Sequence, residues 1–391
     1  MSVTDGSPAP ERCRTGPASG SGPVPGVPSE RAGASVGSGH ARRTARRDRR
    51  RLSRAPPPGR CGKLDRVNTH EPADGWVEAP DGRRFWGRAG AAGLLVVDAD
   101  GRVLLQHRAD WSHFGGTWGL PGGARHHDET AVEGALRESG EEAAVPGDAL
   151  RLLFSSELDL GFWSYTTVVA RALRSFEPVV SDPDSIALGW VPADDVAGLP
   201  LHPGFAASWP RLRAELASEV HVVVDVANVL GSRPDGWWRD RVGATERLLD
   251  ALSRSAAAGF AASSLSPDGD GLPVAGTTAP ATIAPGDVGA FADDSATEPP
   301  GAPTWRWPTV TAVVEGEARA VADAFEALTV VRAETDGDSA VVARVRGLRS
   351  VEGSAVRVVV VTADRALADS VRAEGAVVLR PGAFRRTVGL D

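Results

Sequence analysis

Residues 122–145 read GGARHHDETAVEGALRESGEEAAV, a glycine pair followed by a single glutamate and then by a run of acids on one predicted helix. An α-helix turns by about 100° per residue. Glu138, Glu141 and Glu142, at positions i, i+3 and i+4, therefore share one arc of its surface. Carboxylates this close repel one another unless a cation lies among them. Because hard oxygen ligands favour Mg²⁺ or Mn²⁺, the stretch predicts a site for one of these ions.

The opposite arc of the same predicted helix is narrower and mostly apolar. It carries Val132, Leu136, Ser139 and Ala143. A stripe of this kind packs one side of a helix onto a sheet. We therefore expect one side of the helix to bind metal and the other to anchor it.

The stretch also fits a longer pattern of fixed positions, G-x5-E-x7-R-E-U-x-E-E-x-G-U, in which U is a bulky aliphatic residue. This pattern is the Nudix box, and the region resembles Nudix hydrolases. The resemblance implies a mixed sheet between helices, and an enzyme that cleaves a diphosphate joined to another group X with metal and an activated water. The matching residues are Gly123, Glu129, Arg137, Glu138, Glu141, Glu142 and Val145.

The resemblance gives each of these side chains a role. It makes Glu138, Glu141 and Glu142 the metal ligands, with Mg²⁺ or Mn²⁺ as the cofactor. It makes Arg137 and Glu129 the ion pair that fixes the loop before the helix. The expected catalytic set is therefore Glu129, Arg137, Glu141 and Glu142.

Two positions depart from the Nudix pattern. Ser139 occupies an aliphatic position and weakens the packing stripe, and Ala144 replaces the glycine that usually ends the helix in the left-handed conformation. Holding an alanine in that conformation costs about 1 kcal/mol. Since neither residue is an expected ligand, we predict a loss of stability and intact chemistry.

The box does not decide the general base. Glu142 lies within the acidic cluster, but several Nudix enzymes take their base from a later loop. Here that loop reads SDPDSIALGW and offers Asp182 and Asp184. All three carboxylates remain candidates.

Substrate choice depends on segments outside the acidic helix. The turn at Gly122 and Gly123 is implied to shape the loop that binds the substrate. The preceding segment DWSHFGGTWG carries aromatic side chains, which either stack on a base or, as we favour, pack under the loop. Trp118 is our candidate among them for a substrate contact. We expect a nucleotide that contains a diphosphate, whose base and X group stay open.

The flanks of the box agree with an α/β domain. Residues 91–97 and 103–107 read as two strands joined by a turn at Asp100-Gly101, and a closing helix is predicted at 205–216. We assign residues 71–218 to the Nudix domain, which is an ordinary domain size.

Two valine-rich runs beyond residue 218 predict a second α/β domain with a parallel sheet. HVVVDVANVL ends its apolar run on Asp225 and Asn228, and VRVVVVTADR ends its run on Thr362 and Asp364. Continuous β-branched runs are typical of strands buried on both faces. Ligands of such sheets gather at the carboxyl ends of the strands, where both aspartates are expected.

This second region, residues 219–391, resembles the NYN branch of PIN-like nucleases, in particular the YacP-like group. The resemblance implies that Asp225, Asp338 and Asp364 bind a metal, with Asn228 in support, and that RNA is a possible substrate. The alternative is a degenerate domain in which Asp336 and Asp364 only cap helices. Residues 261–304, rich in Gly, Pro, Ala, Ser and Thr, are expected to form a disordered insertion.

Residues 1–70 are expected to form a disordered arm rich in Arg, Pro and Gly. They contain RRTARRDRRRLSR at 42–54 and carry a net charge of +9, which leaves −17 for the rest of a chain at −8. Such an arm would contact nucleic acid through phosphates. The alternative is an upstream start assigned to a gene that begins near Val67, since Met1 is the only methionine.

Both cysteines, Cys13 and Cys61, lie in this arm, so the folded part has no disulfide and no thiolate site. No apolar run is long enough to span a bilayer, and we expect a soluble, cytoplasmic protein.

Two functions therefore compete. One is a Nudix pyrophosphohydrolase, and the other is a nucleic-acid-binding or RNA-cleaving protein in which the Nudix unit senses nucleotides.

Overall fold

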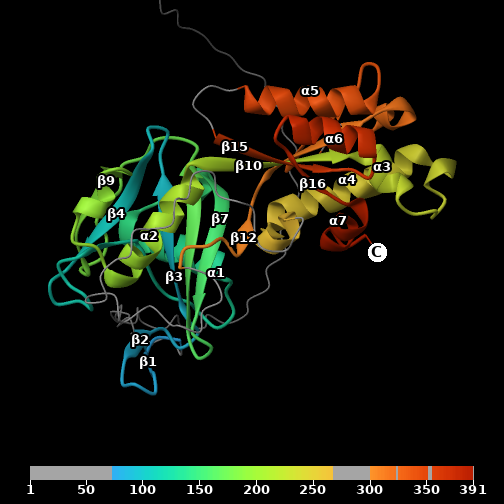
Figure 1. The fold of residues 1–391 in the computed structure, drawn as a ribbon. Coiled ribbons are helices and arrows are strands. Elements are labelled where there is room, and N and C mark those ends of the chain that lie inside the picture. Colours follow the sequence, from blue (N-terminus) through green and yellow to red (C-terminus); the bar gives the residue numbers. More distant parts are fainter. Residues whose placement is uncertain (1–72, 267–299, 323–324, 351–354, 391) are drawn as a thin grey trace, which may run out of the picture. The chain divides into compact units, whose positions relative to one another are not determined.

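The computed structural model describes residues 73–266, 300–322, 325–350 and 355–390. The chain separates into two units, residues 1–66 and 67–391, and all described residues belong to the second. The expected N-terminal arm therefore lies outside the described residues. Within the described part, the strands form a nine-stranded sheet, a five-stranded sheet and a two-stranded hairpin (Figure 1).

The nine-stranded sheet is mixed, as predicted. Its order is β11-β12-β7-β8-β3-β4-β5, with β6 paired to β3 and β9 paired to β4. Only the β3–β8 pairing is parallel. The strands are β3 (Ala91–Val97), β4 (Arg102–Arg108), β5 (Trp118–Gly119), β6 (Gly122–Ala124), β7 (Leu150–Asp159), β8 (Ser164–Ala172), β9 (Ser185–Pro192), β11 (Phe260–Ala261) and β12 (Trp305–Arg306).

Strand β3 is buried along its whole length because a helix covers each face of it. Successive side chains of a strand point to opposite faces. Leu94 and Val96 accordingly pack in the cluster of helix α1 (Ala131–Ala143), whereas Leu95 and Val97 pack in the cluster of helix α2 (Pro203–Leu216). The run AAGLLVV thus joins the two helices to one sheet.

Helix α1 begins and ends as its sequence dictates. Thr130 and Glu133 form a reciprocal capping box, in which the Glu133 N–H donates to Thr130 Oγ1 at 3.2 Å and the Thr130 N–H donates to Glu133 Oε2 at 2.8 Å. Ser139 and Ala143 are buried in the packing stripe. Ala144 ends the helix in the left-handed conformation, with φ 53°, so the predicted strained exit is confirmed.

The hairpin consists of β1 (Trp76–Glu78) and β2 (Arg84–Trp86), which pair antiparallel. It precedes β3 in the chain, and the sequence did not lead us to expect it.

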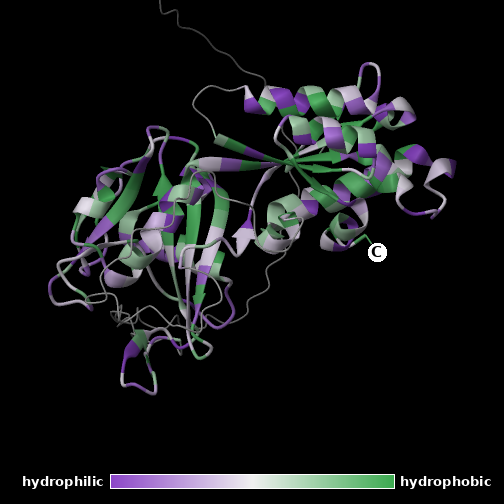
Figure 2. Ribbon diagram, in the orientation of Figure 1, coloured by the Kyte–Doolittle hydropathy of each residue, from purple (hydrophilic) through white to green (hydrophobic). Residues whose placement is uncertain are grey.

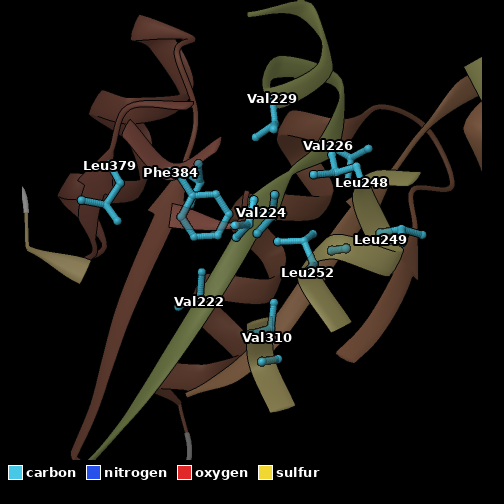
Figure 3. Close-up of a cluster of buried hydrophobic side chains, with 14 of the residues drawn as sticks. Val222, Val224, Val226, Val229, Leu248, Leu249, Leu252, Val310, Leu379 and Phe384 are labelled. Atoms are coloured by element: carbon cyan, nitrogen blue, oxygen red, sulfur yellow. The ribbon is translucent and has the colours of Figure 1, made fainter. Parts of the chain in front are cut away.

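The five-stranded sheet is entirely parallel, as the valine runs predicted, in the order β14-β13-β10-β15-β16. Its central strand β10 (Ser218–Asp225) directs Val222 and Val224 to one cluster and Val223 to the other. Figure 3 shows Val222 and Val224 among side chains of the helices on their side, including Leu252 and Phe384. The remaining strands are β13 (Thr309–Val314), β14 (Leu328–Arg332), β15 (Ala355–Val361) and β16 (Val377–Leu379).

Helices cover both faces of this sheet (Figure 1). Figure 2 shows hydrophobic strands at its centre and helices on which hydrophilic residues alternate with hydrophobic ones. The helices are α3 (Val226–Gly231), α4 (Arg241–Ala258), α5 (Gly337–Arg349), α6 (Arg365–Ala373) and α7 (Pro381–Thr387). None of the helices in the described part of the chain is long and apolar enough to cross a membrane.

The segment expected to be a disordered insertion requires a correction at both of its ends. Residues 262–265 form a 3₁₀ helix, and the Thr304 N–H donates to the carbonyl of Ser155 at 2.7 Å. Strand β12 follows the segment directly and pairs with β7, so Trp305 lies opposite Ser155 and Arg306 opposite Phe154. The residues between them, 267–299, lie outside the described residues. The valine pattern did not reveal β12 because a two-residue strand has no period to detect.

Arg306 of β12 also reaches a buried carboxylate of helix α2. Its Nη2 donates to Glu215 Oε2 at 2.7 Å, and Arg357 of β15 donates to the same oxygen. The Glu215 side chain is completely buried. Burial acts to raise the pKa of Glu215, but the charges of Arg306 and Arg357 outweigh burial and hold the pKa below its usual value.

Candidate active site

The loop before α1 is fixed by the ion pair that the box predicted. Arg137 Nε donates to Glu129 Oε2 at 3.0 Å and Arg137 Nη2 donates to Glu129 Oε1 at 2.6 Å, a bidentate arrangement. The same Nη2 donates to the carbonyl of Ala124 at 2.9 Å. These hydrogen bonds lower the pKa of Glu129 and raise that of Arg137. The pair thus joins strand β6, the following loop and the helix.

Glycine is required at two positions because other groups lie too close. A Cβ at Gly123 would lie 2.8 Å from Cδ and Oε2 of Glu138. A Cβ at Gly122 would lie 2.3 Å from the carbonyl oxygen of Ala92 in the neighbouring strand. The glycine pair therefore lets the Glu138 carboxylate approach the backbone of β6.

Glu142 points to the same strand. Its Oε2 accepts hydrogen bonds from the N–H of Gly122 at 2.8 Å and from Nε2 of Gln106 at 3.3 Å. Burial, followed by the charges of Glu138 and Asp182, raises the pKa of Glu142 to about 8, although the hydrogen bond from Gly122 opposes this shift. Burial and the neighbouring negative charges thus outweigh the Gly122 hydrogen bond and the charge of Arg108.

Gln106 is a site residue that the sequence did not reveal. It is completely buried in β4, and its Nε2 also donates to Ser185 Oγ at 2.6 Å. Its Oε1 is buried without a hydrogen-bond partner. Gln106 therefore connects Glu142 with the loop that carries Asp182 and Asp184. A polar residue inside an apolar strand, VLLQH, was the available signal.

The donor set of α1 fits a hard cation chemically, but the side chains do not converge. Arg137 Nη1 donates to Glu138 Oε1 at 2.9 Å and to Glu141 Oε2 at 3.3 Å, and the Glu141 side chain is 62% exposed. Among the described residues, no group of three or more His, Cys, Asp or Glu side chains is close enough to hold a metal ion. All three predicted ligands supply oxygens, which suits Mg²⁺ or Mn²⁺. Binding an ion would require Glu138 or Glu141 to turn away from Arg137.

A cavity of about 610 Å³ lies beside the glycine pair. Gly122 and Gly123 line it, and the carboxylates of Glu138 and Glu142 lie against this glycine pair without lining the cavity themselves. Hairpin β1–β2, the loop at residues 109–116 and the start of α2 supply other walls, and Pro300 and Gly301 also contribute. This volume is within the range of small-molecule sites.

Arg108 and Asp184 are two of the charged residues that line this cavity. Arg108 Nε donates to the carbonyl of His113 at 3.1 Å. Burial and the charge of Asp182 raise the pKa of Asp184, while Arg108 opposes this shift. Asp182 instead accepts a hydrogen bond from the Asp184 N–H at 2.6 Å and does not line the cavity. Sequence reasoning offered the two aspartates equally and did not consider Arg108.

The position of Trp118 corrects our expectation for the aromatic segment. Trp118 stacks on His107 with ring centroids 4.8 Å apart, packs against the core cluster of α2, and is not among the cavity-lining residues. Trp111, His113 and Phe114 do line the cavity, and Trp111 is 69% exposed. Packing was therefore the correct interpretation for Trp118 and the wrong one for Trp111.

Asp225 and Asp364 lie at the carboxyl ends of β10 and β15, as predicted. Asp225 caps helix α3, and Asp364 caps helix α6. Asp225 Oδ1 accepts the N–H of Asn228 at 3.1 Å, and Asp225 Oδ2 accepts Asn228 Nδ2 at 2.8 Å and Thr362 Oγ1 at 2.9 Å. Asp364 Oδ1 accepts the N–H of Leu367 at 2.8 Å. Asp364 therefore caps the start of α6.

Asp338 lies within electrostatic reach of both. Burial and then the charges of Asp225 and Asp364 raise its pKa. Glu315, which follows β13, also acts on Asp338 and accepts the N–H of Gly337 at 2.7 Å, and the sequence reading had missed it. The predicted ligands Asp225, Asp338 and Asp364 therefore share one region, but in the described chain they do not form a group that could hold a metal ion.

The chain belongs to the Nudix family, and it is a Nudix pyrophosphohydrolase. Residues 87–212 match the family described as "NUDIX domain". A Mycobacterium tuberculosis protein named "Putative 8-oxo-dGTP diphosphatase 3" is 50% identical over 155 residues, which cover 37% of this chain and 71% of that protein. A Bifidobacterium longum "Nucleoside triphosphate pyrophosphatase/Nudix hydrolase fusion protein" is 43% identical over 157 residues, 38% of this chain and 33% of that protein.

A solved structure of "a Nudix Hydrolase from M. Smegmatis, RenU" is 49% identical, with 37% of this chain and 95% of that chain covered and a TM-score of 0.34.

Proposed function

We propose that this enzyme hydrolyses a nucleoside triphosphate whose base is an oxidised guanine. Water is added across a phosphate anhydride, and a nucleoside monophosphate and pyrophosphate are released. One observation carries the proposal: the Glu138 and Glu142 carboxylates lie against the same glycine pair that lines the cavity. The name of the Mycobacterium tuberculosis relative supports the substrate class.

Glu138, Glu141 and Glu142 are the residues that would hold Mg²⁺ or Mn²⁺. When bound, such an ion neutralises phosphate oxygens and lowers the pKa of a bound water. Arg137 fixes the helix that carries the three acids against Glu129 of the preceding loop. Gln106 and the Gly122 N–H orient the Glu142 carboxylate.

We assign Asp184 as the group that removes a proton from the attacking water. Its carboxyl group lines the cavity, whereas Asp182 does not, and Glu142 is engaged by Gly122 and Gln106. Arg108, which also lines the cavity, would balance the negative charge of the polyphosphate. Replacing Asp184 by Asn should lower kcat with little change in KM.

A substrate panel tests the proposal. The full chain is incubated with Mg²⁺ and, separately, with 8-oxo-dGTP, the four common deoxynucleoside triphosphates, ADP-ribose and diadenosine tetraphosphate, and products are identified by ³¹P NMR. We expect monophosphate and pyrophosphate from 8-oxo-dGTP or dGTP. Turnover restricted to ADP-ribose or diadenosine tetraphosphate would overturn the assigned substrate class.

A second candidate function concerns the five-stranded sheet. We propose that its carboxyl edge cleaves RNA, as the likeness to PIN-like nucleases implies, with Asp225, Asp338 and Asp364 as ligands and Asn228 in support. The supporting observation is that Asp338 lies close enough to buried Asp225 and to Asp364 for its charge to interact with theirs.

Asp364→Asn is the informative variant for this second function. Asparagine caps a helix about as well as aspartate, so the fold is expected to survive. RNA cleavage should be lost in Asp364→Asn and retained in Asp369→Asn, an exposed control on the same helix. If wild type does not cleave RNA, or if Asp364→Asn cleaves it equally well, this second function is overturned and Asp364 serves only as a helix cap.

A further inference from the structure

Three exposed tryptophans lie around the cavity. Trp76 and Trp86 on the hairpin are 40% and 41% exposed, and Trp111 on the following loop is 69% exposed. All three line the cavity. Large exposed aromatic side chains that gather in one place mark a surface that receives a ligand or partner. We call these three residues the tryptophan collar.

The hairpin half of the collar is fixed on two sides of the cavity. On one side, Trp163 Nε1 donates to the carbonyl of Trp86 at 3.1 Å, and the rings of Phe85 and Trp163 lie 4.7 Å apart. On the other side, the Trp76 ring meets the His113 ring at 5.3 Å. The hairpin is therefore attached both to the β8 side and to the loop at 109–116.

The loop half of the collar is fixed as well. Phe114 adopts φ 55°, a conformation that side chains other than glycine rarely take, and Thr117 Oγ1 donates to its carbonyl at 2.6 Å. A Cβ at Gly115 would lie 2.3 Å from the carbonyl oxygen of Asp110, so the loop is tightly folded. The folded loop thus keeps the Trp111 side chain exposed, although its hydrophobicity alone would favour burial.

The chemistry around the collar fits a planar base that is joined to phosphates. The Arg84 guanidinium lies over the Trp76 ring, 4.9 Å from its centroid, so that face already accepts a flat, delocalised group. Arg83, Arg84 and Arg108 line the same cavity and supply positive charge to it. Aromatic faces beside guanidinium groups are the combination that binds stacked bases and their phosphates.

We propose that the tryptophan collar stacks the nucleobase of the substrate, with the polyphosphate directed toward Gly122 and Gly123. The inference rests on the proposed nucleotide substrate and adds where its base binds. It makes Trp76, Trp86 and Trp111 specificity-determining residues, and it leaves no role in base binding for Trp118.

The test compares a nucleotide with a phosphate chain that lacks a base. Because the proposed activity would hydrolyse the nucleotide, dGTP is used here as its non-hydrolysable α,β-methylene analogue. Dissociation constants for this dGTP analogue and for tripolyphosphate are measured in the presence of Mg²⁺ on the full chain and on Trp111→Ala, the variant least coupled to folding because of its exposure. Trp238→Ala, 49% exposed and not among the cavity-lining residues, is the matched control. Trp76→Ala and Trp86→Ala follow, with circular dichroism as a check on folding.

We expect the dissociation constant for dGTP to rise about tenfold or more in Trp111→Ala, with that for tripolyphosphate unchanged and the control equal to wild type. Trp111→Phe should restore most of the dGTP affinity. Equal weakening of dGTP and tripolyphosphate, or no weakening in any collar variant, overturns the inference. Failure of the proposed function is distinct, since it appears as wild-type protein that binds dGTP at the collar and hydrolyses no nucleotide.

Discussion

At the scale of single residues, Ala144 shows how a departure from the Nudix pattern is absorbed. It keeps the left-handed conformation that glycine usually takes, and its N–H still donates to the carbonyl of Gly140. Ala144→Gly should therefore raise the free energy of unfolding by about 1 kcal/mol, which urea denaturation measures. Ala217→Gly is the control, because Ala217 ends α2 at φ −67° and gains nothing from glycine. Equal effects at the two sites would refute this explanation.

Gly123 tests the close approach of Glu138. In Gly123→Ala the added Cβ would lie 2.8 Å from the Glu138 carboxylate, so that carboxylate must shift from its position beside β6. We expect kcat to fall by about tenfold or more, because small displacements of reacting groups are costly. Gly147→Ala, where a Cβ meets nothing within 4 Å, should leave kcat unchanged. A Gly123→Ala enzyme with wild-type kcat would show that the spacing is unimportant.

What the sequence could predict at this scale was set by period and spacing. The helix fixes Glu138, Glu141 and Glu142 relative to one another, and the Arg137–Glu129 pair follows from the box. Gln106, Arg108, Trp76 and Trp86 were not predicted because they reach the site through strand pairing and loop folding, which single-sequence patterns do not contain. Trp118 was misjudged for the same reason, since which side of its strand faces the core depends on register.

At the scale of elements, His202 shows how a helix start constrains a titrating group. Its Nδ1 accepts the N–H of Gly204 at 3.2 Å at the start of α2. Burial, aided by the charges of Arg108 and His113, lowers the pKa of His202 to about 4. As the pH falls, His202 therefore becomes protonated near pH 6.5 in the unfolded chain but only near pH 4 in the folded chain.

The resulting pH dependence has a definite sign. The stabilisation that comes from neutral His202 is fully present above about pH 6.5 and is lost as the pH falls toward 4. His202→Asn keeps a capping acceptor but does not titrate. The decrease in unfolding free energy between pH 7 and pH 4 should be smaller in this variant than in wild type. Parallel pH profiles, measured by urea denaturation, would contradict the lowered pKa.

Strands and helices of both sheets were largely predictable, because strong apolar runs mark them. The hairpin β1–β2 and the two-residue strand β12 were not, because three or two residues carry no usable period.

At the scale of the whole molecule, a buried carboxylate of α2 accepts hydrogen bonds from two arginines that are distant in sequence. Glu215 lies at the end of the Nudix region, whereas Arg306 and Arg357 belong to β12 and β15. Removing one partner of a buried charge group leaves the others uncompensated, which costs about 3 kcal/mol or more.

Glu215→Gln should therefore lower the free energy of unfolding by about 3 kcal/mol. Glu219→Gln, a partly exposed acid that pairs with Arg151, is the control and should cost about 1 kcal/mol or less. Urea unfolding followed by tryptophan fluorescence gives both values. A cost in Glu215→Gln no greater than in the control would mean that this ion cluster does not stabilise the chain. No local pattern could have predicted it, since its members are 91 and 142 residues apart.

The central claim is that the acidic face of α1 beside the glycine pair performs the hydrolysis, and kcat of Glu142→Gln tests it most directly. Turnover of 8-oxo-dGTP at saturating Mg²⁺ should fall by about a thousandfold relative to wild type. Glu133→Gln, on the same helix, preserves the capping box and should stay within about twofold. Wild-type turnover in Glu142→Gln, with the control equally active, would contradict the account.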